Sequence, residues 1–111
     1  MSHYLHKKLA IPTLTGLKFL CIDKIVHLQS DEDYTTFFLT GKTQFTSSRP
    51  LKWYVYLLRN HHFIRIHQSH FINTDCLADF KKGKYSTVIM DDGSQIDVSR
   101  RCKGKFRKFF E

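Results

Sequence analysis

The stretch that decides the fold occupies residues 63–73 and reads FIRIHQSHFIN. Successive side chains of a β-strand point to opposite faces of the sheet. A strand here places Ile64 and Ile66 on one face, and it places Arg65 and His67 on the other. The sequence therefore predicts a strand with an apolar inner face and a basic outer face, followed by a turn near Gln68.

The polar residues of this stretch suit contact with a phosphate backbone. Arg65 offers a forked donor, and Ser69 offers a small hydroxyl that can approach a backbone oxygen closely. In a loop, the amide of Gln68 can pair with the edge of an adenine through two hydrogen bonds. The alternative is structural: Arg65 forms a surface ion pair, and His67 makes a capping hydrogen bond within the fold.

Short segments rich in aromatic and β-branched residues recur along the chain, and Gly, Asp and Thr turns separate them, as is typical of a mostly antiparallel β-domain. The residues Thr40-Gly41-Lys42, Lys82-Gly83-Lys84 and Asp92-Gly93 predict hairpin turns. The strands expected from this pattern are residues 18–22, 25–29, 34–39, 44–47, 63–66, 76–80, 86–90 and 95–98.

Two segments predict helices. The first covers residues 50–58, with Ser48 available as a cap and Pro50 compatible with the first turn. One face of this helix is apolar and is expected to pack on the sheet; it comprises Leu51, Tyr54, Val55 and Leu58. The second helix follows Ser99, and Gly104 weakens it by about 1 kcal/mol. Its apolar side comprises Cys102, Phe106 and Phe109.

The composition limits the class of protein. A chain of 111 residues forms one domain, expected over residues 11–111, with residues 1–10 as an arm or the remnant of a longer chain. The net charge of +8 favours a polyanionic partner. The three cysteines lack the spacing of a disulfide framework or a zinc site, which indicates a reducing cytoplasm. No run approaches the roughly 18 apolar residues of a membrane helix.

Residues 63–73 resemble the F-x-R-x-H-x-S-x-x-V-N core of the LytTR DNA-binding domain family, with Ile72 in place of the usual Val. The resemblance extends in order from about Ile11 to Phe110, and such an ordered set is far more specific than a lone R-x-H. The further matching positions are Ile11-Pro12-Thr13, Gly16, Asp23-Lys24-Ile25, Asp33-Tyr34, Gly93 and Val98-Ser99-Arg100.

The resemblance implies a mainly β fold, an elongated arrangement of small antiparallel sheets with about ten short strands, one short interior helix and a C-terminal helix. It also implies sequence-specific binding of double-stranded DNA, with loops reading successive major grooves, as the output domain of a bacterial response regulator. The implied partners are DNA with paired repeats, a receiver domain in the full-length regulator, and a second copy of the domain on DNA.

The resemblance assigns base reading to Tyr34, Gln68 and Arg100. Tyr34 remains open, because three acidic neighbours at residues 31–33 would repel phosphate, and its ring could instead pack on Thr36. The positions matched to backbone contact or to the family pattern are Arg65, His67 and Ser69. Arg101 and Lys103 lie beside Arg100; they add sequence-independent attraction or else form a solvated basic tail.

Two rival functions share some of these features. The nearer rival is a basic β-barrel that binds RNA or single strands by stacking bases on Phe and Tyr. An enzyme has thin support, and no cofactor or metal is expected. The histidines at 61, 62, 67 and 70 lack a metal-binding spacing. A grouping of Ser69, His67 and Asp75 lacks a nucleophile-elbow motif.

Overall fold

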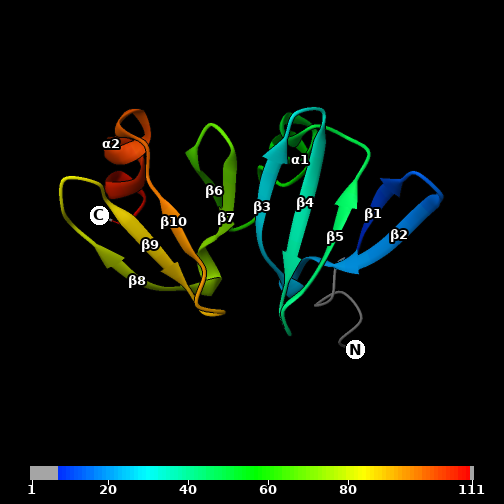
Figure 1. The fold of residues 1–111 in the computed structure, drawn as a ribbon, viewed down its shortest axis with the longest axis horizontal. Helices are drawn as coiled ribbons and strands as arrows, with labels where there is room; N and C mark the ends of the chain where they lie inside the picture. The colour runs from blue at the N-terminus through cyan, green and yellow to red at the C-terminus, as the bar shows by residue number, and fades with distance from the viewer. Residues whose placement is uncertain (1–7, 111) are drawn as a thin grey trace.

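The computed structural model describes residues 8–110 (Figure 1), which form ten strands in three antiparallel sheets and two α-helices. The expected mainly β fold is confirmed. The elements are β1 (Lys8–Thr13), β2 (Gly16–Cys21), β3 (Ile25–Asp31), β4 (Tyr34–Leu39), β5 (Thr43–Ser47), α1 (Leu51–Leu57), β6 (Phe63–His67), β7 (His70–Asn73), β8 (Leu77–Lys81), β9 (Thr87–Met90), β10 (Gln95–Asp97) and α2 (Arg100–Phe109).

A five-stranded sheet in the order β5-β4-β3-β7-β6 occupies the centre of the molecule. The β1–β2 hairpin lies at one end, and the sheet β10-β9-β8 lies with α2 at the other (Figure 1). The expected arrangement of small sheets is present, because the three sheets follow one another along the longest axis (Figure 1); the Cα extents are 42 × 37 × 24 Å, so the molecule is thinnest in one direction. No helix within residues 8–110 is long and apolar enough to cross a membrane.

The central sheet is buried on both faces over part of its area, so it separates two cores. In β7, Phe71 belongs to the core beneath α1, and Ile72 belongs to the core shared with β9 and α2. Side chains that alternate between two cores leave no polar face, which explains why residues 70–73 did not show the pattern of a half-buried strand. Burying each such large apolar side chain contributes about 1.5–3 kcal/mol.

All eight strands expected from the sequence coincide with a strand of the structure, within the usual error at the ends. β1 and β7 were missed. The expected arm over residues 1–10 overlaps β1, because Lys8, Leu9 and Ala10 pair with residues of β2. The rest of that arm, residues 1–7, lies outside the described residues. The turns at Gly41 and Gly93 have φ of 82° and 88°, the left-handed region that glycine tolerates.

Both helices lie where the sequence placed them, with one correction at the start of α1. Pro50 precedes α1, and the helix has no side-chain cap; the Ser47 hydroxyl, not that of Ser48, accepts the amide of Arg49 at 3.1 Å. Ser47 lies at the buried end of β5, where its hydroxyl also bonds to that of Tyr54. At α2, Ser99 caps the amide of Cys102 at 3.2 Å, as expected.

Phe106 and Phe109, both predicted on the apolar side of α2, differ in burial. The side chain of Phe109 is 47 % exposed, whereas that of Phe106 is 5 % exposed and packs in the second core. Phe106 meets the ring of Phe80 at 5.1 Å between centroids, and this core ends there. The last turn of α2 therefore carries aromatic side chains into solvent.

His27 is a buried histidine of β3 in the central sheet. It is 3 % exposed, its ring stacks on that of Phe38 at 4.3 Å, and its Nδ1 has no hydrogen-bond partner among the described residues. Burial lowers the pKa of His27 to about 4, and the nearby carboxylate of Asp92 offsets this only in part. The folded protein therefore holds this imidazole neutral at neutral pH.

We expect His27→Phe to flatten the dependence of stability on pH. In the unfolded chain His27 takes up a proton near pH 6.5, whereas in the fold it does so only near pH 4. The unfolded state then binds more protons between these values, so the parent loses up to about 3 kcal/mol of unfolding free energy as the pH falls through this window. Phenylalanine keeps the ring on Phe38 and has no such loss. Urea unfolding at pH 7 and pH 4.5 measures this dependence. If the unfolding free energy of His27→Phe fell between the two pH values as much as that of the parent, the prediction would be contradicted.

Candidate nucleic-acid interface

Two turns lie side by side at one end of the central sheet. β3 and β7 are antiparallel, with Gln29 opposite His70 in the register. The amide of Ser30 donates to the carbonyl of Ser69 at 2.8 Å, which ties the end of β3 to the β6–β7 turn. Figure 1 shows the β3–β4 turn and the β6–β7 turn at the top of the molecule.

The start of α2 joins this end through a second backbone contact. The amide of Ser99 donates to the carbonyl of Ile66 at 2.8 Å, and Arg100 begins the helix at the next residue. Three segments distant in sequence thus form a single edge, which we call the loop edge and define as residues 31–34, 67–70 and 99–103. All eight residues predicted to contact DNA lie in these segments or, for Arg65, directly beneath one of them.

The β6–β7 turn is fixed by side chains of its own hairpin. Arg65 donates from Nε to the carbonyl of His67 at 3.4 Å and from Nη2 to the carbonyl of Gln68. The Nδ1 of His67 accepts the amide of Ser69 at 3.0 Å. Arg65 and His67 are half-buried, while Gln68 is exposed. The turn therefore has a fixed backbone and presents a free amide side chain.

These contacts bear on the structural alternative for Arg65 and His67. The capping hydrogen bond of His67 is present, as that alternative predicted. The predicted surface ion pair of Arg65 is wrong for the described residues, because its guanidinium donates to two carbonyl oxygens of the turn instead of to a carboxylate. Since Nδ1 of His67 is an acceptor, a neutral ring carries its proton on Nε2 and can donate it outward.

The basic residues at the start of α2 face solvent. Arg100 and Arg101 are exposed and Lys103 is half-buried. The ion pairs recorded within residues 8–110 join His62 to Asp75 and Lys81 to Asp79, so neither neutralises this helix. A hollow of about 450 Å³ next to the turn brings α2 and β6 together; its lining comprises Arg65, His67, Gln68, Ser99, Arg101 and Cys102. Positive charge is thus concentrated around Gln68.

Tyr34 begins β4 opposite Asp31, and its side chain is 44 % exposed. The acidic residues 31–33 beside it are exposed as well. Negative charge at this end of the loop edge contrasts with the positive charge around Gln68 and α2. The edge is therefore polarised along its length.

The structure also places Arg49 near the start of β4. The sequence did not single out this residue. β5 ends beside the start of β4, where the hydroxyl of Thr35 donates to the carbonyl of Arg49 at 2.8 Å. The guanidinium of Arg49 is exposed and lies 4.9 Å from the centre of the Trp53 ring. Only the pairing of β4 with β5 reveals this position, since no local motif surrounds it.

The residues considered for a catalytic or metal site do not lie together in the structure. Asp75 lies at the far end of the β6–β7 hairpin from His67 and Ser69, and its Oδ2 is 3.0 Å from Nδ1 of His62. The part of the chain that the structure describes holds no cluster of three metal-ligating side chains.

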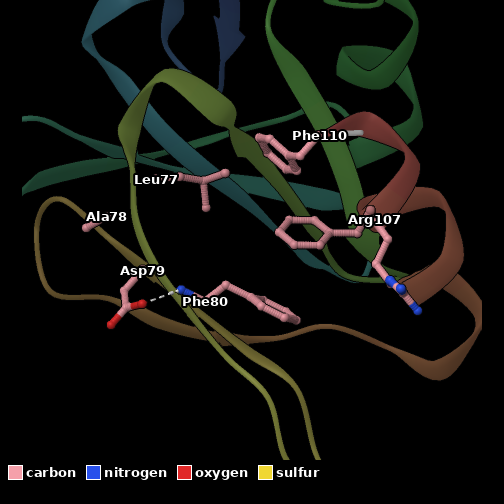
Figure 2. Close-up of a pocket in the computed structure, with 7 residues that line it drawn as sticks. Leu77, Ala78, Asp79, Phe80, Arg107 and Phe110 are labelled. Atoms are coloured by element: carbon pink, nitrogen blue, oxygen red, sulfur yellow. Dashed lines mark hydrogen bonds between the residues drawn. The ribbon is translucent and has the colours of Figure 1, made fainter.

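A separate hollow of about 400 Å³ lies between β8 and α2, away from the loop edge. Leu77, Phe80 and Phe110 make it apolar, and Arg107 and Asp79 lie at its rim (Figure 2). No serine, cysteine or histidine of the described residues lines it.

We expect Arg65→Met to loosen the β6–β7 turn. The change keeps the apolar stem but removes two charge-assisted hydrogen bonds, which costs about 1–3 kcal/mol of local stability. Amide hydrogen exchange at Ser69 should become faster. Arg59→Met is the control, because Arg59 donates to the carbonyl of Tyr56 at 2.7 Å and has no hydrogen bond to the β6–β7 turn recorded within residues 8–110. Unchanged exchange at Ser69 in Arg65→Met would contradict the assigned role.

Comparisons with known proteins identify the family and the fold. The family model of the LytTr DNA-binding domain matches residues 15–111. Among solved structures, a LytTr DNA-binding domain assigned to a methyl-accepting/DNA response regulator from Bacillus cereus has a similar fold, with a TM-score of 0.78 and 23 % identity over 93 % of this chain and 95 % of that chain. No curated protein sequence gives a significant match. The chain belongs to the LytTr DNA-binding domain family.

Proposed function

We propose that this DNA-binding domain recognises a specific double-stranded sequence through the loop edge, with Tyr34, Gln68 and Arg100 reading bases in successive major grooves. The observation that carries the proposal is the convergence of three distant segments through the Ser30–Ser69 and Ser99–Ile66 hydrogen bonds. Each of the three proposed readers is exposed on its own segment. A row of short loops suits this task where a single recognition helix is absent.

The chemistry of the readers differs along the edge. The amide of Gln68 can pair with N6 and N7 of adenine, and the guanidinium of Arg100 with O6 and N7 of guanine. Tyr34 lies beside the acidic residues 31–33, where a phosphate would be repelled. Its hydroxyl and ring are therefore suited to a base, not to the backbone.

The remaining predicted residues suit the backbone of DNA. His67 can donate from Nε2, and no hydrogen bond of the Ser69 hydroxyl is recorded within residues 8–110. Arg101 and Lys103 supply charge, and Arg49 adds a further cation near the start of β4. Arg65 acts mainly by holding the turn and adds its charge from beneath. Such contacts orient a protein on DNA without reading sequence.

The domain, expected over residues 11–111, is proposed to act as a non-catalytic output module of a bacterial two-component regulator in the cytoplasm. The similar domain from Bacillus cereus is assigned to a response regulator, which supports a receiver domain elsewhere in the full-length protein. Paired repeats on DNA with two copies of the domain form part of the proposal.

Selection of duplexes from a random pool at near-physiological salt tests the function. Enrichment of one site, with a preference of about 10³ or more over scrambled duplex, is the expected result. The rival function, binding of RNA or single strands, predicts that single-stranded RNA displaces the protein from every duplex equally well. That displacement, with no enriched site, would replace the present proposal.

Gln68→Ala and Arg100→Ala should each weaken binding to the selected site by about 1–3 kcal/mol, with little effect on random duplex. Gln44→Ala is the matched control, because Gln44 is exposed near the opposite end of the sheet, across from Phe38. Fluorescence titrations of both duplexes measure the effect. Equal losses on the two duplexes would exclude base reading by the mutated residue.

Lys103→Ala should weaken binding to all duplexes alike and reduce the slope of log K against log salt by about one, because one phosphate contact is lost. Lys24→Ala removes the same charge just before β3, at the end opposite the loop edge, and should leave the slope unchanged. If both variants behave alike, Lys103 acts only through net charge and not at the interface.

A further inference from the structure

A groove, distinct from the two hollows described above, lies behind the β6–β7 hairpin, between α1, β6 and α2. It encloses about 450 Å³, within the size range of pockets that hold small molecules. Phe63 and Phe71 form its floor; they are 8 % and 3 % exposed and stack on each other at 5.3 Å. Val55 of α1 and the exposed Phe109 of α2 form its walls. The groove therefore offers an apolar, largely aromatic interior.

Four cations surround this apolar interior: Arg59, Arg65, Lys105 and Lys108. No carboxylate of the described residues lines the groove. The two arginines donate to carbonyl oxygens and therefore keep their full charge. Lys105 and Lys108 are exposed, and neither has an ion pair or hydrogen bond recorded within residues 8–110. The groove thus combines uncompensated positive charge with an apolar floor.

This combination is poorly matched to a DNA backbone, which has no apolar group to bury against Phe63 and Phe71. It matches a ligand with an apolar tail and one anionic head. A guanidinium pairs with a planar carboxylate through two parallel hydrogen bonds, and the tail gains from burial on the aromatic floor. We propose that the groove between α1, β6 and α2 is a binding site for a small amphipathic carboxylate. The inference does not rest on the proposed DNA recognition.

Arg65 lines this groove and also the hollow at the loop edge. Its guanidinium holds the carbonyls of His67 and Gln68. A carboxylate bound at Arg65 competes with these carbonyls, so the groove is linked physically to the turn that presents Gln68. Binding in the groove should therefore be visible at Arg65 and at the turn as well as on the groove walls.

Titration of the whole domain with phenylbutyrate, followed by NMR amide shifts, tests the proposal without DNA. Phenylbutanol carries the same tail without charge, and butyrate carries the head without the ring. We expect phenylbutyrate to bind with a dissociation constant on the order of 1 mM and the other two at least about fivefold more weakly. Shifts should centre on Val55, Arg65 and Phe71, and extend to Gln68.

Neighbouring cations of α2 provide a matched pair of variants. Lys108 lines this groove, whereas Arg107 lines the apolar hollow beside β8 (Figure 2). Lys108→Glu should weaken phenylbutyrate binding about fivefold or more, and Arg107→Glu should change it less than about twofold. Lys105→Glu serves as a second groove variant should Lys108→Glu alter the fold.

Three results would overturn the proposal. Equal binding of phenylbutyrate and phenylbutanol would show an apolar patch without an anion site. Shifts centred on Leu77 and Phe80 would assign the ligand to the other hollow. Equal effects of Lys108→Glu and Arg107→Glu would reduce the attraction to net charge. None of these results bears on recognition of DNA, which the duplex selection tests separately.

Discussion

The antiparallel pairing of β3 with β7 is the contact on which the rest of the structure depends. It joins residues about forty positions apart and sets the order β5-β4-β3-β7-β6. Through this pairing, Leu28 and Phe71 share one core, while Ile72 enters the other. The same pairing brings the amide of Ser30 to the carbonyl of Ser69. One strand pair thus divides the interior and places two of the three segments of the loop edge together.

Some side chains of the loop edge stabilise the fold, and others are exposed and available to a ligand. Arg65 and His67 satisfy the backbone of the β6–β7 turn, and Ser99 satisfies the start of α2. These bonds fix loops that would otherwise have to be ordered on binding, at a cost in conformational entropy. The exposed side chains at the tips remain free for the proposed contacts with bases. A resemblance in which Arg and His recur as a pattern therefore reflects the shape of the turn as much as direct contact with DNA.

Much of the fold could be predicted from the sequence, because half-buried strands such as β4 alternate and because Gly41 and Gly93 mark their turns. β7 was missed because both of its faces are buried and no alternation remains. β1 was missed because a two-stranded hairpin at the end of the molecule buries little more than Ile11. The different burial of Phe106 and Phe109 could not be predicted, because helical periodicity indicates an apolar face and not where the core ends.

The proposed site residues were taken from the ordered motif, and the sequence did not indicate that they lie close to one another. Tyr34, Gln68 and Arg100 lie on different segments, and only the pairing of β3 with β7 and the Ser99–Ile66 bond brings those segments together. No local sequence motif surrounds Arg49. The contacts of Arg65 with the turn and its place in the groove between α1, β6 and α2 depend on the three-dimensional structure.

Mapping of a bound duplex on the domain by NMR amide shifts tests the central claim most directly. The account predicts that the duplex enriched by selection changes the amide shifts of residues 31–34, 67–70 and 99–103 together, at the same ratio of duplex to protein. The shifts of the β1–β2 hairpin and of the β4–β5 turn should stay unchanged. Perturbation of only one of the three segments, or of the opposite end of the central sheet, would contradict the loop edge as the surface that recognises DNA.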